Sequence, residues 1–207
     1  MTSWESPEKV TEYVGRIGAL PQRLAGEAVL AEVIPRVPRR ALDLGCGDGR
    51  LAQVILDARA GIEEFVAVDV SPPMLERARA RFGDDPRVII RAWDLREPIG
   101  PLGAFDLVVS GFAIHHLEDD RKQALFRETA ALLNPGGMFC NLEVVASATA
   151  EWHTAFRAAI GREEDDPDDR LVDVETQLFW MRSAGFEQVD CIWRWRGFAL
   201  LVGAARA

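Results

Sequence analysis

Cysteine, positive charge and long apolar runs are all scarce in this chain. Its 207 residues include three cysteines, and 24 lysines and arginines against 33 acidic residues. Three separated cysteines, Cys46, Cys140 and Cys191, without a C-x-x-C pair argue against a disulfide framework and favour reduced thiols in the cytoplasm. The net charge of −9 argues against general affinity for nucleic acid or an anionic membrane, since both need lysine and arginine to neutralise phosphate.

No segment has the length that a membrane span requires. The longest late apolar run, Phe198 to Ala205, is far too short to cross a bilayer, and the first residues contain no apolar signal core. With 48% hydrophobic residues, the chain is long enough for one well-buried domain and too short for two large ones. We therefore expect a soluble, cytoplasmic, single-domain protein with no membrane partner and no nucleic-acid partner.

Strand-like and helix-like patterns alternate over the first two thirds of the chain. Ser71 precedes two prolines, which is typical of a helix N-cap, and Asn134-Pro-Gly-Gly137 is a strong breaker cluster. The expected strands are 41–44, 64–70, 87–94, 105–111 and 138–145, and the expected helices are 51–60, 71–82 and 118–133. This alternation predicts an α/β fold whose mainly parallel sheet has helices on both faces and binds ligands at the carboxyl ends of its strands.

The last third departs from this pattern. A helical pattern over 171–184 ends at Gly185, and two strand patterns, 186–195 and 198–205, are separated only by Arg196 and Gly197. A connection this short forces the two strands to be antiparallel. A parallel sheet that ends in an antiparallel hairpin is not the usual ending of a nicotinamide-binding domain.

A glycine-rich turn follows the first expected strand. Gly45, Gly47 and Gly49 lack the Cβ atoms that would keep a ligand away from the backbone, so we expect a nucleotide-like cofactor there. The spacing is tighter than the G-x-G-x-x-G pattern of dinucleotide-binding proteins. This difference weakens the case for a pyrophosphate at the turn.

Five motifs follow one another along the chain, and most place a polar residue where a strand ends. They are Asp43-Leu-Gly-Cys-Gly-Asp-Gly49, Asp69, Trp93-Asp94, Phe105-Asp-Leu-Val-Val-Ser110 and Leu133-Asn-Pro-Gly-Gly137. With the terminal hairpin, this set resembles the class I methyltransferases that use S-adenosylmethionine, over roughly Arg39 to Ala207. The resemblance implies a Rossmann-like three-layer sandwich, with a seven-stranded, mainly parallel sheet and an antiparallel C-terminal hairpin. It also implies one compact domain, in which residues 39–207 bind the cofactor and residues 1–38 form a helical arm packing over its site.

The resemblance implies a ribose and adenine site at the ends of the second and third strands. Asp69 would accept hydrogen bonds from both ribose hydroxyls, and Asp94 would take the adenine amino group beside the Leu95 N–H. Trp93 or Val70 would flank the ring. The alternatives are a solvated acid for Asp69 and ordinary packing for Trp93.

The methionine end of the cofactor would lie on the glycine-rich turn. Gly45 and Gly47 would let the backbone approach it, while Asp43 would hold the loop and face the ammonium group. Cys46 is interpreted as a small buried side chain rather than a reactive thiol. The full expected cofactor-binding set is Asp43, Gly45, Cys46, Gly47, Gly49, Asp69, Val70, Met74, Trp93, Asp94, Leu95, Ser110 and Gly111. The expected product is S-adenosylhomocysteine.

Two adjacent histidines, His115 and His116, follow the fourth strand, where the methyl group should project. Related small-molecule methyltransferases often have an apolar-His-His-apolar stretch there, as Ile114 to Leu117 is here. With an ordinary pKa of about 6.5, a histidine can take a proton from the nucleophile, so both are candidate catalytic residues. The alternative is a structural role for both, with catalysis by proximity alone. Adjacent histidines rarely chelate one ion and no further ligand has suitable spacing, so no metal is expected.

Segments outside the alternating pattern are expected to hold the acceptor. The expected substrate-binding residues are Tyr13, Arg23, Phe112, Trp152 and Trp193. The alternatives are a packing helix with solvated arginines for the N-terminal arm, and tryptophans packed under a helix. The acidic run 163–169 is interpreted as a solvated loop.

The predicted function is transfer of a methyl group from S-adenosylmethionine to an oxygen, nitrogen or carbon nucleophile of a small molecule. Two alternatives stay open, namely an enzyme like the carboxy-S-adenosylmethionine synthases and a non-enzymatic protein that binds the cofactor. A nicotinamide-dependent oxidoreductase is disfavoured by the glycine spacing and the terminal hairpin. The acceptor is not specified by the sequence, and a homodimer is left open.

Overall fold

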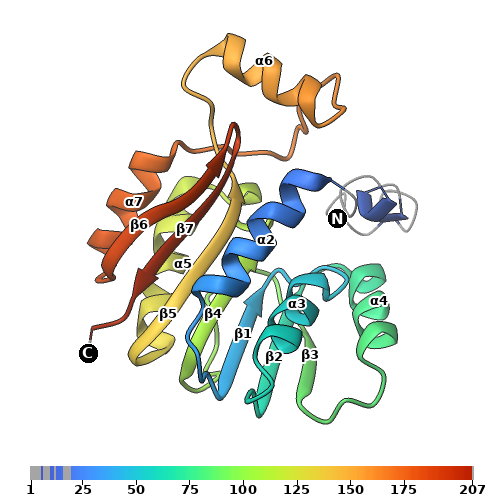
Figure 1. Ribbon diagram of the computed structural model, residues 1–207, viewed down its shortest axis with the longest axis vertical. Helices are drawn as coiled ribbons and strands as arrows, with labels where there is room; N and C mark the ends of the chain where they lie inside the picture. Colours follow the sequence, from blue (N-terminus) through green and yellow to red (C-terminus); the bar gives the residue numbers. More distant parts are fainter. Residues whose placement is uncertain (1–5, 7–9, 12, 16–19, 207) are drawn as a thin grey trace.

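The protein is a seven-stranded sheet between two layers of helices (Figure 1). The computed structural model describes residues 6, 10, 11, 13–15 and 20–206. The strands lie in the order β3-β2-β1-β4-β5-β7-β6. The predicted three-layer α/β sandwich is confirmed.

Five strands are parallel to one another. They are β1 (Arg40–Leu44), β2 (Glu64–Asp69), β3 (Val88–Ala92), β4 (Phe105–Gly111) and β5 (Leu133–Val144). Ala41 of β1 pairs with Phe65 of β2 on one side and Leu107 of β4 on the other. The chain order therefore reverses between β1 and β4, which leaves a crevice at the carboxyl ends of these strands.

The last two strands, β6 (Glu187–Trp195) and β7 (Phe198–Ala204), form the predicted antiparallel hairpin. Arg196 in its turn has a left-handed φ of 49°. A Cβ atom at Gly197 would lie 2.7 Å from the ring of Phe156, so only glycine fits this contact. β7 also pairs with β5, which places the last strand of the sequence inside the sheet and β6 at its edge.

The helices form two layers, and one further helix lies outside both (Figure 1). One layer contains α2 (Pro21–Val33), α3 (Arg50–Ala58) and α4 (Pro72–Phe82), and the other contains α5 (Asp119–Leu132) and α7 (Val174–Ser183). The remaining helix, α6 (Ala150–Ala159), stands apart beyond the carboxyl ends of the parallel strands, in the connection from β5 to α7. None of the helices in the described residues is long and apolar enough to cross a membrane.

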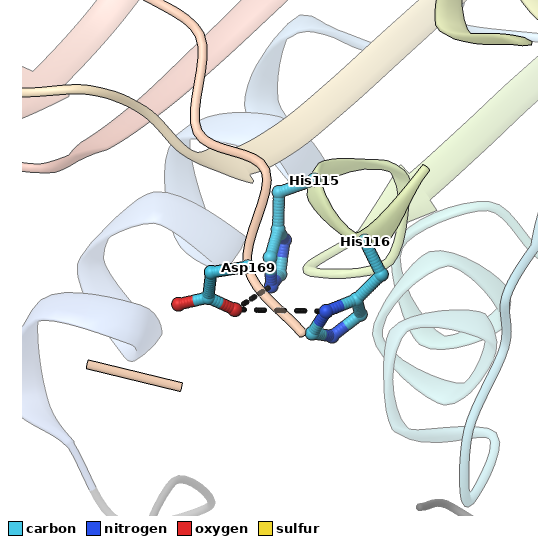
Figure 2. Close-up of side chains that lie close together, drawn as sticks. All are labelled: His115, His116 and Asp169. Carbon is cyan, nitrogen blue, oxygen red and sulfur yellow. Dashed lines mark ion pairs between the residues drawn. The ribbon is translucent and has the colours of Figure 1, made fainter. Parts of the chain in front are cut away.

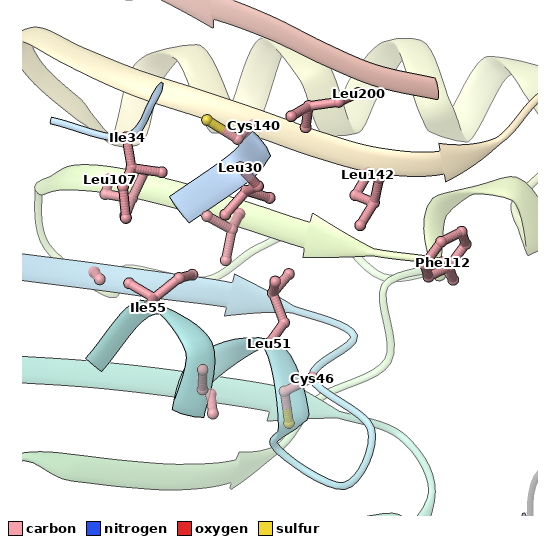
Figure 3. Packing of buried hydrophobic residues seen from close by; sticks show 14 of the residues in the cluster. Leu30, Ile34, Cys46, Leu51, Ile55, Leu107, Phe112, Cys140, Leu142 and Leu200 are labelled. Atoms are coloured by element: carbon pink, nitrogen blue, oxygen red, sulfur yellow. The ribbon is translucent and has the colours of Figure 1, made fainter. Parts of the chain in front are cut away.

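Each face of the sheet has its own apolar core. On the α2 and α3 side, Leu30 and Ile55 belong to one buried cluster with Leu107 of the sheet (Figure 3). On the α5 and α7 side, the rings of Phe126 and Phe139 lie 5.9 Å apart. Because both faces are covered, consecutive residues of the central strands are buried, as in Ala41 to Leu44 and Leu107 to Ser110, rather than alternately buried and exposed.

Several predicted boundaries need correction. β5 begins at Leu133 instead of 138, because Leu133 already pairs with Phe105 and the breaker cluster forms an irregularity before the ladder resumes at Met138. Helix α7 begins at Val174, three residues later than predicted, because the Asp173 carboxylate accepts the Thr176 N–H and caps it. The predicted cap at Ser71 is confirmed by its side chain, which accepts the Met74 N–H at 3.4 Å.

The N-terminal arm predicted over residues 1–38 is described in part. Residues 10, 11 and 13–15 of the arm are helical, and its helix α2 packs against α3 and the β5-β7-β6 end of the sheet. Residues 1–5, 7–9, 12 and 16–19 lie outside the described residues.

Candidate functional site

A cavity of about 510 Å³ opens at the carboxyl ends of β1 to β4. Its wall contains the residues that follow each of these strands, namely Gly45 to Gly47, Asp69 and Val70, Trp93 to Leu95, and Gly111 to Ala113. Tyr13, Arg23, Met74 and His116 complete the set of predicted residues that line it. The cavity thus occupies the point where the strand order reverses, which is where doubly wound sheets bind ligands.

The three glycines of the turn are needed for different structural reasons. Each has a positive φ, between 53° and 78°. A Cβ atom would lie 2.3 Å from Ala113 at Gly45 and 2.5 Å from the Phe82 ring at Gly49, so packing inside the protein requires these two glycines. At Gly47 the nearest atom would lie 3.8 Å away. Gly47 is therefore the glycine whose missing side chain leaves the cavity wall open.

Asp69 is fixed at the cavity wall by two main-chain hydrogen bonds. Its Oδ2 accepts the Gly47 N–H at 2.8 Å, and its Oδ1 accepts the Ser71 N–H at 2.8 Å. Burial raises the pKa of Asp69, although these hydrogen bonds oppose the shift. Each oxygen has a further lone pair with which to accept a hydroxyl.

Asp43 ends β1 just before the turn and is fully buried. Neither of its carboxylate oxygens has a hydrogen-bond partner among the described residues. Burial, with a smaller contribution from the charge of Asp69, raises the pKa of Asp43 to about 8. A buried polar group without a partner costs about 1–3 kcal/mol, so a cation brought close to Asp43 would be stabilised.

Two arginines of the cavity wall share one buried glutamate. Arg23 Nε lies 2.8 Å from Glu27 Oε1, and Arg50 Nη2 lies 2.7 Å from Glu27 Oε2. Two guanidinium groups against one carboxylate leave one positive charge in excess, which suits an anionic ligand group. Arg23 is buried, with its guanidinium over the Phe112 ring at 5.1 Å, so the alternative of a solvated arginine is wrong here.

The third strand end supplies a mixed polar and apolar wall. Trp93, Asp94 and Leu95 all line the cavity. The Asp94 carboxylate is held by Arg96, whose Nε lies 2.9 Å from Oδ2, and this side-chain hydrogen bond lowers the pKa of Asp94. Asp94 is therefore ionised at neutral pH.

His115 is buried between two carboxylates. Its Nδ1 lies 2.5 Å from Glu143 Oε1, its main-chain N–H donates to Glu143 Oε2 at 3.0 Å, and its Nε2 lies 3.4 Å from Asp169 Oδ1. Burial acts to lower the pKa of His115, but the two carboxylates outweigh it and raise the pKa to about 9. The imidazole is therefore charged at pH 7 and cannot take a further proton.

His116 has the opposite protonation. Burial and the positive charge of His115 lower the pKa of His116 to about 4, so its imidazole is neutral at pH 7. It lines the large cavity and also a smaller one of about 50 Å³ next to it, and the two cavities share Tyr13 and Phe112 as well. Of the two predicted catalytic histidines, His116 is the one that meets both cavities.

The remaining predicted residues do not line the large cavity. The Ser110 hydroxyl is buried and donates to the Leu44 carbonyl oxygen at 2.7 Å. Trp152 is 62% exposed on α6. Trp193 packs against α2, where a Cβ atom at Gly26 would lie 3.0 Å from its ring, as the packing alternative predicts. Cys46, in contrast, does line the large cavity; it is buried, and burial raises the pKa of its thiol, in agreement with an unreactive side chain.

Sequence reasoning missed Glu143 and Asp169. The signal for Glu143 is a lone carboxylate near the end of an otherwise apolar strand. Asp169 belongs to the acidic run 163–169, but the interpretation of a solvated loop is wrong for it, since its side chain is only 12% exposed. No spacing rule connects Asp169 to the histidines, because only the folded loop brings them together.

The chain is similar in sequence to known methyltransferases. Residues 42–139 match the family described as a methyltransferase domain. An uncharacterized methyltransferase of Mycobacterium tuberculosis is 37% identical over 137 residues, or 65% of this chain and 66% of that protein. Trans-aconitate 2-methyltransferase of Rhodococcus jostii is 36% identical over 135 residues, or 65% of this chain and 49% of that protein. The matched part thus spans less than two thirds of the length of these relatives.

Solved methyltransferase structures have the same fold. Human N-acetylserotonin methyltransferase in complex with SAM matches with a TM-score of 0.74 at 16% identity, over 99% of this chain and 58% of that chain. A putative methyltransferase of Haloferax volcanii, solved with a methyltransferase activator, matches with a TM-score of 0.75 at 20% identity, over 100% and 99% of the two chains.

The fold and the site define a Rossmann-like α/β protein with its ligand cavity at the reversal of strand order. An antiparallel hairpin that ends the parallel sheet narrows this class further. In its matched domain and in its fold, the chain is similar to the class I S-adenosylmethionine-dependent methyltransferases.

Proposed function

We propose that this protein transfers the methyl group of S-adenosylmethionine to a small-molecule acceptor. The observation that carries the proposal is the composition of the large cavity. Asp69, fixed next to Gly47, suits the ribose hydroxyls, and a buried carboxyl without a partner lies just before the turn, at Asp43. The glycines of the turn have the spacing G-x-G-x-G, which differs from the G-x-G-x-x-G turn that holds the pyrophosphate in dinucleotide-binding proteins.

The residues of the wall, together with Asp43 and Glu27, which do not line the cavity, fit the parts of the cofactor one by one. Asp69 would bind the ribose, and Trp93, Asp94 and Leu95 would bind the adenine. At the other end, Asp43 would attract the ammonium group, and the excess positive charge around Glu27 would attract the carboxylate. When bound, the cofactor supplies a methyl group already activated on a sulfonium, so the protein need only orient the acceptor and exclude water.

His116 is the proposed residue at the acceptor. It is neutral at pH 7 and lines both cavities, so it can accept a proton from a nucleophile that enters the smaller one. Tyr13 and Phe112, which line both cavities, would form the wall between cofactor and acceptor. His115, which is charged, would hold the η2 turn (Ile114–His116) through Glu143.

A small acceptor is the best supported substrate class. The Rhodococcus relative is named for trans-aconitate, a small molecule. The three cysteines are free, which agrees with the predicted cytoplasmic location. Tyr13 and Arg23 in the cavity wall support the predicted arm over the cofactor site. The homodimer stays a prediction.

Calorimetry with S-adenosylhomocysteine and with a nicotinamide dinucleotide tests the proposal. We expect the first to bind with one site per chain and the second not to bind. Asp69→Ala should weaken S-adenosylhomocysteine binding about tenfold or more, because it removes the charged acceptor for the ribose. Binding of the dinucleotide alone would overturn the proposal, and an unchanged affinity in Asp69→Ala would remove this residue from the site.

A further inference from the structure

Three metal-ligating side chains converge beside the large cavity. Figure 2 shows His115 and His116 of the η2 turn facing Asp169, which comes from the loop that leads to α7. Asp169 Oδ1 lies 3.4 Å from His115 Nε2 and 3.5 Å from His116 Nδ1. Both distances fit ion pairs and are longer than those of strong hydrogen bonds.

The spacing of the three atoms matches a metal site better than a hydrogen-bonded cluster. Four ligands at about 2.1 Å from a zinc ion lie about 3.4 Å from one another in a tetrahedron. Two of the three separations in the cluster have this length, and all three ligand atoms lie within 4.8 Å of one another. The side chain of His116 is 21% exposed and lines both cavities.

Neighbouring charges hold the ligand atoms in orientation. Glu143 lies on Nδ1 of His115 at 2.5 Å, which leaves the opposite nitrogen, Nε2, directed at Asp169. Arg162 Nη1 lies 3.7 Å from Asp169 Oδ2, which leaves Oδ1 directed at the histidines. A carboxylate behind a ligating histidine is the usual outer support of protein metal sites.

The loop with Asp169 is fastened at the cluster. The Arg170 N–H donates to the carbonyl oxygen of His115 at 2.8 Å, and the buried Lys122 ammonium donates to the carbonyl oxygen of Arg170. Both main-chain groups of Arg170 are therefore anchored, which fixes the loop directly after Asp169. The carbonyl oxygen of Asp168 lies 3.4 Å from His116 Nδ1 and is a further oxygen atom of the kind that ligates metals on this side of the cluster.

We propose that His115, His116 and Asp169 bind a divalent metal ion of the zinc class, with Glu143 as a positioning residue; binding displaces the Nε2 proton of His115 to solvent. Two imidazole nitrogens and one carboxylate oxygen suit zinc, and three protein ligands leave one position for an outside group. All three ligands line the smaller cavity, so that position faces it. An acceptor that binds there would carry an oxygen ligand such as a hydroxyl or a carboxylate, an extension that rests on the proposed function.

Zinc titration of the untagged, EDTA-stripped protein tests the site, with no cofactor or acceptor present. We expect one equivalent of Zn²⁺ to bind, and Co²⁺ to give the visible absorption of a tetrahedral site. Asp169→Asn, which preserves size, and His116→Ala should each weaken Zn²⁺ binding by more than about tenfold, and Glu143→Gln by about tenfold. The matched control is His153→Ala, because His153 pairs with Asp165 at 2.7 Å and lies outside the cluster.

The outcomes separate the two proposals. No Zn²⁺ binding in the wild-type protein would overturn the metal site, as would an unchanged affinity in Asp169→Asn or a loss in His153→Ala equal to that in His116→Ala. Circular dichroism checks that each variant is folded, and if His116→Ala fails to fold, the isosteric Asp169→Asn decides. Because binding of S-adenosylhomocysteine is measured separately, failure of the metal site leaves the methyltransferase proposal standing.

Discussion

Replacing glycines of the turn by alanine should separate cofactor binding from stability. Gly47 has a φ of 53°, and an added Cβ would lie 3.8 Å from the Met74 sulfur, in ordinary contact. Gly47→Ala should therefore cost only the left-handed backbone of an alanine, about 1–2 kcal/mol. The same methyl group would fill the cavity wall beside Asp69 and should weaken S-adenosylhomocysteine binding about tenfold or more, or about 1.4 kcal/mol.

Two other glycines provide matched comparisons. Gly136, at the beginning of β5, has a φ of 73° and open space around an added Cβ, so Gly136→Ala should have the backbone cost alone and leave binding unchanged. At Gly49, with a φ of 78°, the Cβ would also lie 2.5 Å from the Phe82 ring. Overpacking adds about 1–3 kcal/mol, so Gly49→Ala should be the least stable of the three variants.

Urea unfolding and calorimetry with S-adenosylhomocysteine measure the two effects independently. Wild-type affinity in Gly47→Ala would refute the placement of the cofactor on this turn. Equal stability of Gly49→Ala and Gly136→Ala would refute the packing argument for the third glycine.

Two further predictions concern buried charge. As pH rises from about 6.5 to about 9, the titration of His115 should lower the free energy of unfolding of the metal-free protein by about 3 kcal/mol. The reason is that the pKa of His115 is raised to about 9 in the folded protein. Its bound proton therefore stabilises the fold fully below the unfolded-state pKa, and this stabilisation is lost as pH rises through the folded-state pKa. Urea unfolding at a series of pH values should show this fall, and the double variant His115→Asn, Glu143→Gln should reduce it by this amount, leaving only the fall that the raised pKa of Asp43 produces in both proteins. Glu27→Gln should lower the free energy of unfolding by about 3 kcal/mol, because Arg23 and Arg50 lose their buried counter-charge.

Each of these two predictions has a result that would contradict it. A stability that stays level between these pH values would mean that His115 is not charged in the folded protein. For Glu27, the control is Glu63→Gln, an exposed glutamate paired with Arg39, which should leave stability nearly unchanged. Equal effects of the two glutamine substitutions would show that burial of Glu27 contributes nothing.

The order of elements and the cofactor side of the site could be predicted from local sequence. Asp69 follows a strand and Gly47 follows another, and in a parallel sheet the carboxyl ends lie at one edge, so these residues had to meet. The short connection at Arg196 and Gly197 likewise left only an antiparallel hairpin. The breaker cluster at 134–137 led to a wrong prediction of where β5 begins, because a bulge tolerates glycine and proline within a strand.

The acceptor side could not be predicted in the same way. Asp169 reaches His115 only through a loop whose main chain is fastened by Lys122, and no periodic pattern records such a contact. Trp193 was equally undecidable, since a strand edge can present a tryptophan to a ligand or to a helix, and here α2 covers it through Gly26. The charge of the run 163–169 did not indicate the position of Asp169 either, because an acidic run on the surface and one that packs against histidines have the same composition.

The position of β7 has a consequence for the order in which the sheet can fold. Although β7 follows β6 in the sequence, it lies between β5 and β6, and its Ala199 pairs in register with Glu143. A chain that has folded only as far as β5 exposes an open strand edge, to which other chains can add. The strand that carries the carboxylate beside His115 therefore gains its second neighbour only when residues 198–204 dock, so the acceptor side of the site depends on a pairing that is distant in sequence.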